Sequence, residues 1–393
     1  MIWQDGPVTV HLGDALTVLR EMPAESVHCV VTSPPYWGLR DYNAPGQLGL
    51  EPTPELYVEH MVEVFREVRR VLRRDGTCWV NLGDSYATNS ASHTYDGMPA
   101  LAEQYRGGSK TLDQVTKPAR SLAGLKPKDL VGVPWRVAFA LQADGWWLRS
   151  DVVWSKPNPM PESVSDRPTK SHEYVFLLTK SARYYYDADA VREPATGHNP
   201  GSLGTHNGNK FDRSAGNTNG LGNSTLHTLS TGRNLRSVWT IATQPYPEAH
   251  FATFPEDLVI PCIKAGTSEH GCCPECGAPW RRITSTEYVK SPVHGNGSVV
   301  GRHYATGQNN FDGAGMPRVN KQVSTTGWQA TCSHGREPIS CSVLDPFAGS
   351  GTTLAVARRL GRRAIGIELQ ADYLPLIQTR VGEAALPLLE AIL

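Results

Sequence analysis

Short apolar runs alternate with amphipathic stretches along the first part of the chain. Val27 to Thr32 is a continuous apolar run rich in β-branched residues, which is typical of a buried parallel strand. Residues 54–74 repeat apolar positions at helical spacing opposite a charged face, and Asp75-Gly76 is expected to end this helix before a strand over 77–82. The order strand, loop, helix, strand predicts an α/β fold with a parallel sheet.

Polar stretches without periodicity separate the remaining elements, which are predicted from continuous apolar runs and from apolar positions at helical spacing. Residues 84–125 are polar and irregular, which predicts a surface loop. In 196–235, Gly, Asn, Ser, Thr and His dominate and apolar residues nearly vanish, so this stretch is predicted to be a long mobile loop without a core of its own. The other predicted strands lie at 8–12, 151–154, 173–179, 342–346 and 363–369, and the other predicted helices at 15–20, 134–144 and 352–360.

Composition narrows the class of protein. A chain of 393 residues is long enough for one large domain with insertions or for two domains. Lys and Arg together number 38, as do Asp and Glu, and this neutral balance argues against a purely electrostatic, tail-driven nucleic-acid binder. No apolar run is long enough to span a bilayer, and Met1 to Asp5 lack the features of a signal peptide. We therefore expect a cytoplasmic protein without a membrane partner.

A glycine-rich loop follows the predicted strand at 342–346. The sequence Asp-Pro-Phe-Ala-Gly-Ser-Gly-Thr-Thr at 345–353 leads from that strand into a helix. Closely spaced glycines let the backbone approach a ligand, and a helix N-terminus favours negative charge. Glu368 ends the next strand, where an acid can bind ribose hydroxyls. A tight turn and a solvated Glu give the same pattern, but the strand, the helix and the acid together favour a nucleoside-cofactor site.

A second loop, Thr-Ser-Pro-Pro-Tyr at 32–36, also ends an apolar strand. Two prolines stiffen it, so the Ser33 hydroxyl and the Pro34 carbonyl form a rigid pair of acceptors. An exocyclic amino group on a base is a poor nucleophile because its lone pair is delocalised into the ring. Two acceptors on its hydrogens would draw the nitrogen toward tetrahedral geometry, and Tyr36 offers a face for a flipped base. Taken alone, the loop is equally typical of a Pro-Pro turn beside a core tyrosine.

The two loops together resemble those of the N4-cytosine/N6-adenine DNA methyltransferase family. Their order, with the catalytic loop first and the cofactor loop near the C-terminus, resembles the permuted β subgroup. The resemblance covers nearly the whole chain outside 84–125, 196–235 and 265–341. It implies a Rossmann-like α/β fold, with a mixed, mostly parallel sheet, helices on both faces and loop insertions. It also implies S-adenosyl-L-methionine as the cofactor and double-stranded DNA as the partner, with direct in-line methyl transfer that depends on positioning.

The resemblance implies roles for single residues as well. Gly13-Asp14 resembles the opening segment of the family, whose acid lies near the cofactor adenine, and His250 to Pro255 resembles the element that packs against the cofactor. Trp154 to Pro157 resembles a segment near the target pocket. The implied catalytic residues are Ser33, Pro34, Pro35 and Tyr36, and the implied cofactor-binding residues are Asp14, Phe254, Asp345, Phe347, Gly349, Gly351 and Glu368.

The family pattern divides the chain into five parts. They are a catalytic half at 1–184, a target-recognition region at 185–238, a cofactor-packing segment at 239–264, an insertion with a zinc knuckle at 265–341, and a cofactor-binding half at 342–393. Basic side chains of the recognition region are candidates for contacts to phosphates and guanines, and a surface loop with scattered charge is the alternative. These candidates are Arg192, Lys210, Arg213, Arg233 and Arg236.

The residue before Pro-Pro bears on the target base. Family members with Ser at this position mostly resemble cytosine-N4 enzymes, whereas Asp or Asn is typical of adenine-N6 enzymes. Ser33 therefore favours cytosine N4 and leaves adenine N6 as the alternative. Methylation at carbon 5 requires a cysteine nucleophile, usually in a Pro-Cys pair. Pro261-Cys262 lies on a predicted helix with no carbon-5 motif around it, so Cys262 is interpreted as a buried structural cysteine.

Six of the eight cysteines lie between 262 and 341, and in a cytosolic protein such clustering indicates a metal site before disulfides. A Cys-x-x-Cys-Gly knuckle and a later Cys-x-His pair would give the closed tetrahedral site of structural zinc. Such a site would order the ends of the long Gly/Asn-rich loop predicted at 285–331. The other cysteines of this stretch keep the choice of ligands open, and free thiols near the core are the alternative. The candidate ligands are Cys273, Cys276, Cys332 and His334.

Other functions share parts of this pattern. Methyltransferases that act on RNA or on protein glutamine use similar Pro-Pro-Tyr chemistry but usually carry Asn before Pro-Pro. A non-enzymatic DNA-binding zinc protein would not need both loops intact. No nuclease motif of the Pro-Asp-Glu-x-Lys kind stands out in the sequence, which favours a methyltransferase without a fused endonuclease. We expect a monomer or a weak dimer, and the sequence leaves open whether the enzyme belongs to a restriction-modification system or acts alone.

Overall fold

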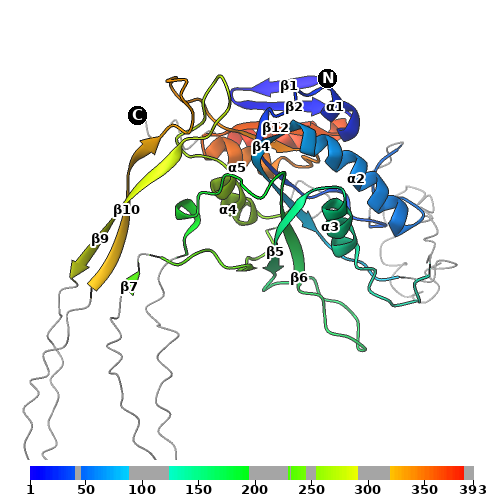
Figure 1. Ribbon diagram of the computed structural model, residues 1–393. Helices are drawn as coiled ribbons and strands as arrows, with labels where there is room; N and C mark the ends of the chain where they lie inside the picture. Colours follow the sequence, from blue (N-terminus) through cyan, green and yellow to red (C-terminus); the bar gives the residue numbers. More distant parts are fainter. Residues whose placement is uncertain are drawn as a thin grey trace, which may run out of the picture. The chain divides into compact units, whose positions relative to one another are not determined.

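The computed structural model describes residues 1–39, 46–87, 124–193, 229–230, 232–244, 254–290 and 319–384 (Figure 1). The chain divides into two compact units. Unit 1 comprises Met1–Asp187, Arg236–Arg281 and Ala330–Leu393, and unit 2 comprises Ala188–Leu235 and Arg282–Gln329. Among the helices within these described residues, none has the length and apolar character needed to cross a membrane.

A nine-stranded sheet forms the centre of unit 1. In chain order its strands are β1 (Ile2–Asp5), β2 (Val8–Leu12), β3 (Val27–Thr32), β4 (Leu72–Leu82), β5 (Trp147–Ser155), β6 (His172–Thr179), β8 (Val238–Thr240), β11 (Ser342–Asp345) and β12 (Arg363–Glu368). Their order in the sheet is β1-β2-β12-β11-β3-β4-β6-β5-β8. The five strands from β2 to β4 in that order are parallel, β1 and β6 pair antiparallel with their neighbours, and β8 is parallel to β5.

Helices cover both faces of this sheet. On one face α1 (Ala15–Glu21), α2 (Pro54–Val71) and α3 (Val133–Ala143) pack in a row, and on the other α4 (Glu256–Gly266), α5 (Thr352–Arg359) and α6 (Leu374–Glu383) do so (Figure 1). Every residue of β3 is buried, because Val30 joins the core beneath α2 while Cys29 contacts Cys262 of α4 on the opposite face. This is the Rossmann-like, mostly parallel architecture that the sequence predicts.

The boundary between α2 and β4 differs from the prediction. Thr53 caps α2 by accepting the Leu56 amide at 3.2 Å, but the helix ends at Val71 rather than at 74. Leu72 is extended and fully buried, so it begins the strand, and Asp75-Gly76 lies inside β4 instead of before it. A Cβ on Gly76 would stand 2.8 Å from the His28 carbonyl, so this glycine allows the close pairing of β4 with β3.

Unit 2 contains strands where loops were predicted. Its sheet has the order β7-β10-β9, with β7 at Leu229–Ser230, β9 at Arg281–Lys290 and β10 at Val319–Gln329. The prediction of one loop over 285–331 is therefore wrong at both ends, since the β-branched residues flanking the Gly/Asn-rich middle pair as strands. Two smaller elements are η1 (Asp189–Val191) and η2 (Ala371–Tyr373). The predicted loops at 84–125 and 196–235 lie almost entirely outside the described residues.

The parallel strands of unit 1 all end at one edge of the sheet. Parallel strands share a direction, so their carboxyl ends meet and the loops that follow them face one crevice. This edge therefore brings together loops that are far apart in the sequence. The residues that directly follow β2, β3, β4, β11 and β12 are Gly13, Ser33, Gly83, Pro346 and Leu369.

Candidate active site

The loop between β11 and α5 has the conformation that its glycines predict. Gly349 and Gly351 have φ values of +53° and +81°, in the left-handed region where a side chain is strained. A Cβ on Gly351 would meet the Ile377 side chain at 3.2 Å, so this glycine serves the packing of α6. A Cβ on Gly349 would have only the Phe347 carbonyl within 4.0 Å, so Gly349 borders open space. Of the two glycines, Gly349 is the one at which a ligand can approach the backbone.

Glu368 forms hydrogen bonds with three loops at this edge of the sheet. Its carboxylate accepts the Gly349 amide at 2.7 Å and the Gln370 amide at 2.8 Å, and its backbone carbonyl accepts the Gly13 amide at 2.9 Å. Asp14 follows Gly13 and caps α1, with Oδ1 accepting the Thr17 amide at 2.8 Å. Asp14, the acid predicted for the opening segment, thus follows a residue that is hydrogen-bonded to Glu368. Asp14 is also the N-cap of α1.

Two carboxyl groups of this edge are buried. Burial raises the pKa of Asp345 to about 6 and the pKa of Glu368 to about 7. Asp345 Oδ1 accepts the Thr32 hydroxyl at 2.6 Å and the Phe347 amide at 3.1 Å. Asp345 Oδ2 is buried and has no hydrogen-bond partner among the residues that the structure describes. A ligand with N–H or O–H donors would satisfy these acceptors, and such donors are the amino and ribose hydroxyl groups of S-adenosylmethionine.

The catalytic loop joins this cluster directly. The bond from Thr32 to Asp345 links the end of β3 to the end of β11, so the Ser-Pro-Pro-Tyr loop and the glycine loop start from hydrogen-bonded neighbours. The Tyr57 hydroxyl donates to the Pro35 carbonyl at 2.9 Å and anchors the loop to α2. No donor in the described part of the chain contacts the Pro34 carbonyl.

Ser33 and Tyr36 belong to a part-buried polar network beside the apolar core. The Ser33 hydroxyl lies 3.4 Å from both the Tyr36 hydroxyl and Asn81 Oδ1, and it can donate to either. The Tyr36 hydroxyl donates to Glu173 Oε2 at 2.7 Å, and Asn81 Nδ2 donates to the same oxygen at 3.0 Å. Lys156 forms an ion pair with the other Glu173 oxygen. Burial, followed by the Glu173 charge, raises the pKa of Tyr36 well above its usual value, so the phenol remains a donor.

Asn81 and Glu173 are not among the residues that the sequence predicts for the site. The signal was present: Asn81 interrupts the buried run Trp79-Val80-Asn81-Leu82, and Glu173 precedes the apolar run at 174–178. The register of β4 against β6 places Asn81 opposite Val175, so both polar residues lie near the end of β4 beside the catalytic loop. Lys156 belongs to the Trp154–Pro157 segment, and its ammonium lies 4.2 Å from the Trp154 ring centre.

Phe254 lies near the junction of the two loops. It lines a hollow together with Thr32 and Asn81, and apolar residues of β4, β6 and α4 complete the wall. The preceding residues, 250–253, lie outside the described part of the chain. Cys262, also on this wall, is 1% exposed and donates to the Leu258 carbonyl within α4, as its interpretation as a buried structural cysteine requires.

Two of the basic candidates for DNA contact form ion pairs, and a third, Arg236, lies in unit 1, where its carbonyl accepts the Trp239 indole N–H at 2.7 Å. Within unit 2, Arg192 bonds Asp189 at 2.6 Å and Arg233 bonds Glu193 at 2.6 Å. Lys210 and Arg213 lie outside the described residues. These ion pairs give the arginines a role inside their own unit, so the structure assigns no DNA contact to them.

The four predicted metal ligands lie together in unit 1. The candidate ligand atoms of the two pairs, Cys273 with Cys276 and Cys332 with His334, are all within 4.8 Å of one another. The cluster contains no residue from the catalytic loop or the glycine loop.

Comparison with known proteins identifies the family. The model of the DNA methylase family with N6 and N4 members matches residues 27–274 and 340–379, which include the catalytic loop, the glycine loop and Glu368. The chain belongs to the N6/N4 DNA methylase family. It is therefore an S-adenosylmethionine-dependent DNA methyltransferase that acts on an exocyclic amino group. Membership of the family establishes the reaction. It does not determine whether the target base is cytosine or adenine.

Several relatives of this methyltransferase are Type II enzymes. It is 45% identical over 291 residues to the Type II methyltransferase M.XycI of Xanthomonas campestris pv. cyanopsidis, covering 74% of this chain and 78% of that protein. It is 36% identical over 374 residues to M.SmaI of Serratia marcescens, covering 94% and 89% respectively. The fold is shared with the cytosine-N4-specific PvuII DNA methyltransferase, at a TM-score of 0.51 and 17% identity, over 96% of this chain and 87% of that one.

Proposed function

We propose that this methyltransferase modifies N4 of cytosine in double-stranded DNA, as part of a Type II restriction-modification system like those of its relatives. The observation that carries the choice of base is the neutral surroundings of Ser33. Its hydroxyl hydrogen can point to Tyr36 or to Asn81 Oδ1, and this leaves the lone pairs of Oγ free to accept from an amino group. The Glu173 carboxylate contacts Tyr36 and Asn81 rather than Ser33, so the acceptor offered to the base is a hydroxyl.

The catalytic loop would hold the target amino group at two points. Ser33 Oγ accepts one of its hydrogens and the Pro34 carbonyl accepts the other, while Pro35 and the Tyr57 contact keep the loop rigid. The base has left the duplex and stacks on the Tyr36 ring. Bound S-adenosylmethionine supplies an electrophilic methyl group on its sulfonium. As the N–C bond forms, the amino nitrogen becomes cationic and must lose a proton.

The network of Ser33, Tyr36 and Glu173 can transfer that proton away from the amino nitrogen. Ser33 lies 3.4 Å from the Tyr36 hydroxyl, which lies 2.7 Å from Glu173 Oε2. The N–H bond breaks as Ser33 accepts the proton and passes its own to Tyr36, and Tyr36 in turn passes its proton to the Glu173 carboxylate. Lys156 holds that carboxylate in place through the ion pair, with both side chains less than one-fifth exposed.

The cofactor side would use the residues that meet around Glu368. Its carboxylate, already held by the Gly349 and Gln370 amides, accepts from the ribose hydroxyls, and Asp14 lies next to it on the α1 cap. Gly349 lets the cofactor approach the loop backbone, with Gly351 maintaining the turn. Asp345 and Phe347 shape the loop between them, and Phe254 packs against the cofactor from the hollow near Thr32.

The division of the chain follows the same proposal. Residues 1–184 and 342–393 form the catalytic and cofactor-binding halves, 239–264 joins them, and 185–238 reads the target sequence. This assignment is supported by the shared sheet of the first two segments and by the separation of most of 185–238 into unit 2. We propose a cytoplasmic monomer or weak dimer.

Identification of the modified nucleoside tests the choice of base. The purified enzyme should be incubated with PCR-amplified DNA, which carries no methylation, and with S-adenosylmethionine bearing a deuterated methyl group. After digestion to nucleosides, mass spectrometry is expected to find trideuterated N4-methyldeoxycytidine. Trideuterated N6-methyldeoxyadenosine would overturn the choice of base and leave the family intact. The same reaction with Ser33→Ala serves as the control for contaminating activity.

The position of the Tyr36 ring can be tested through Gly83. A Cβ at Gly83 would stand 2.5 Å from Tyr36 Cε2, and Gly83 lies outside the left-handed region, so Gly83→Ala moves the ring without straining the backbone. Because a displacement of about 1 Å at a positioning residue can cost about 100-fold, we expect kcat to fall about 10- to 100-fold with an unchanged Kd for the cofactor.

Gly382→Ala is the matched control for this substitution. Gly382 lies in α6 with nothing within 4 Å of the added Cβ, so its kcat should stay within about twofold of wild type. A kcat for Gly83→Ala equal to that of this control would show that the ring position is immaterial.

A further inference from the structure

The spacing of four side chains in the 265–341 insertion matches a tetrahedral metal site. The ligand atoms of Cys273, Cys276, Cys332 and His334 all lie within 4.8 Å of one another, and Cys273 Sγ is 3.7 Å from His334 Nδ1. Zinc–sulfur bonds of about 2.3 Å place tetrahedral ligand atoms roughly 3.8 Å apart. The chain therefore holds three thiols and an imidazole nitrogen at the separation that one zinc ion requires.

The remaining ring nitrogen of His334 faces a carboxylate oxygen, the kind of group to which metal-bound histidines usually donate. Nδ1 faces Cys273, while Nε2 lies 3.7 Å from Glu275 Oε2. Metal-binding histidines usually donate the N–H of their other ring nitrogen to a carboxylate or carbonyl, which fixes the tautomer that leaves a lone pair for the metal. Arg336 holds the second Glu275 oxygen in an ion pair. This arrangement is an observation independent of the ligand spacing.

Hydrogen bonds between the segments that carry the two ligand pairs hold them together on either side of the cluster. Cys272 and Ile339 exchange both of their N–H···O bonds at 2.8 Å, and the Thr331 hydroxyl donates to the Pro279 carbonyl at 2.7 Å. The first pair sits on a tight turn in which the Gly277 amide donates to the Cys273 carbonyl at 2.8 Å. Gly277 has φ +65°, so the turn needs the glycine of the Cys-x-x-Cys-Gly motif.

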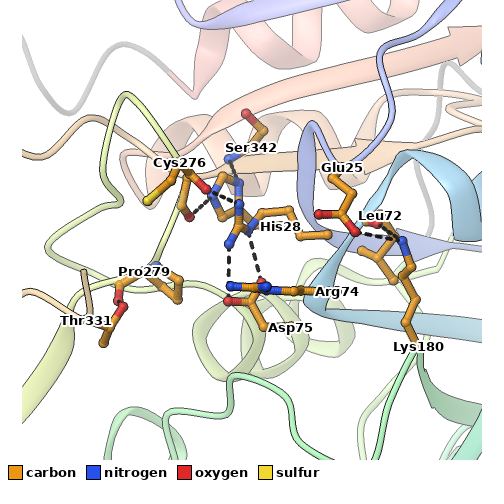
Figure 2. Close-up of polar contacts among 12 residues, drawn as sticks. Glu25, His28, Leu72, Arg74, Asp75, Lys180, Cys276, Pro279, Thr331 and Ser342 are labelled. Carbon is orange, nitrogen blue, oxygen red and sulfur yellow. Dashed lines mark hydrogen bonds and ion pairs between the residues drawn. The ribbon is translucent and has the colours of Figure 1, made fainter. Parts of the chain in front are cut away.

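The same turn is attached to the amino-terminal ends of β3 and β4. His28 Nε2 contacts the Gly277 carbonyl at 2.9 Å, and Arg73 donates to the Cys276 carbonyl and to Asp75. Figure 2 shows His28 between Ser342 and the loop of Cys276. Because Ser33 follows the other end of β3, the cluster stands at the edge of the sheet opposite the active site.

A second group of potential ligands, His28, Cys272 and Cys341, is excluded by the same contacts. His28 Nδ1 accepts the Ser342 amide at 3.1 Å, so Nε2 carries the hydrogen that it donates to Gly277. Both ring nitrogens are then in use, and no lone pair is left for a metal. A disulfide does not account for the first group either, since all its cysteines are free and one bond would leave a thiol and the imidazole.

We propose that Cys273, Cys276, Cys332 and His334 bind one structural zinc ion, which holds the segments 273–276 and 332–334 together within unit 1, at the sheet edge opposite the active site. Three of these ligands lie in 275–339, the stretch that the family match skips, so the site belongs to this chain's insertion rather than to the shared fold. Three thiolates and an imidazole with no open position are typical of structural zinc. The ion would contribute to folding, not to methyl transfer.

Metal content and X-ray absorption of the wild-type protein test the ligand set without any variant. Full-length protein from zinc-supplemented medium, purified without chelators, should contain about one zinc per chain by mass spectrometry. Its zinc edge should fit about three sulfurs near 2.3 Å and one nitrogen near 2.0–2.1 Å. Zinc below about 0.2 equivalents, or a shell with oxygen or with fewer than three sulfurs, would overturn the proposal.

Two substitutions distinguish the proposed cluster from its neighbour. Cys332→Ser should reduce bound zinc at least about fivefold, whereas Cys341→Ala, which removes a thiol of the second group, should retain about one equivalent. Loss of zinc only from Cys341→Ala would contradict the assignment. Stripping zinc from the wild type with a chelator should lower Tm and speed proteolysis within 265–341, while the Kd for S-adenosylmethionine stays within about twofold. A parallel loss of cofactor affinity would contradict the structural role.

Discussion

Replacing Ser33 with alanine is expected to lower kcat by about 10²–10³-fold while the Kd for S-adenosylmethionine stays within about twofold. Removal of one preorganised hydrogen-bonding group that acts in the transition state typically costs this much. In the proposed mechanism Ser33 accepts from the amino group as its nitrogen pyramidalises, and none of the hydrogen bonds around Glu368 and Gly349 involves Ser33. Single-turnover methylation and calorimetric titration with the cofactor measure the two quantities separately.

Ser33→Thr is the matched comparison because it keeps the hydroxyl. Its kcat should recover most of the loss, since the oxygen remains within reach of Asn81 and Tyr36. An equal fall of kcat and cofactor affinity in Ser33→Ala would mean that the residue supports the cofactor crevice instead of the base. A variant with wild-type kcat would remove the hydroxyl from the mechanism altogether.

Gly349→Val is expected to abolish cofactor binding, with affinity reduced by more than about 100-fold, equivalent to about 2.8 kcal/mol. The Cβ would project into the open space that borders Gly349, where we propose that the cofactor approaches the backbone. The left-handed φ of +53° adds a strain of roughly 1–2 kcal/mol to the folded state, so stability should fall as well. Calorimetric titration reports the first effect and thermal unfolding the second.

Gly361→Val separates these two effects. Gly361 has φ +74° and nothing within 4 Å of an added Cβ, but it lies beyond the far end of α5. The control should therefore share the loss of stability and keep its affinity for S-adenosylmethionine within about twofold. If both variants lost affinity alike, strain rather than blocked access would be the cause, and the role of Gly349 would have to be revised.

The proximity of Glu368 and the glycine loop could be predicted from the sequence, because each lies at the end of a predicted strand. Glu368 and the glycine loop follow the carboxyl ends of parallel strands, and a parallel sheet brings such ends together whatever the chain order. The hydrogen bond from Glu368 to Gly349 is the contact that this rule implies. Asn81 and Glu173 stand out in the sequence as polar residues beside apolar runs, but their contact with Tyr36 could not be predicted, because it depends on the antiparallel register of β4 and β6.

The fold was predictable where periodicity was long and unbroken. Strands β3, β11 and β12 and helix α3 lie within one or two residues of their predicted positions, since burial on both faces or on one stripe leaves a clear apolar pattern. The end of α2 was misplaced because the charged residues from Arg73 to Asp75 continue a helical surface pattern, while burial of Leu72 turns the chain into β4. The strands of unit 2 were hidden by the Gly/Asn-rich stretch between them.

The order of strands in the sheet also constrains how the enzyme is made. β2 pairs with β1 and β12, and β3 pairs with β11 and β4, so β11 and β12 connect two pieces of sheet that are synthesised much earlier. At about 5–20 residues per second, the ribosome completes β1 to β4 well before the strands that join them emerge. We therefore expect a nascent chain to lack the crevice at the strand ends, and a chain truncated before residue 368 to have no methyltransferase activity.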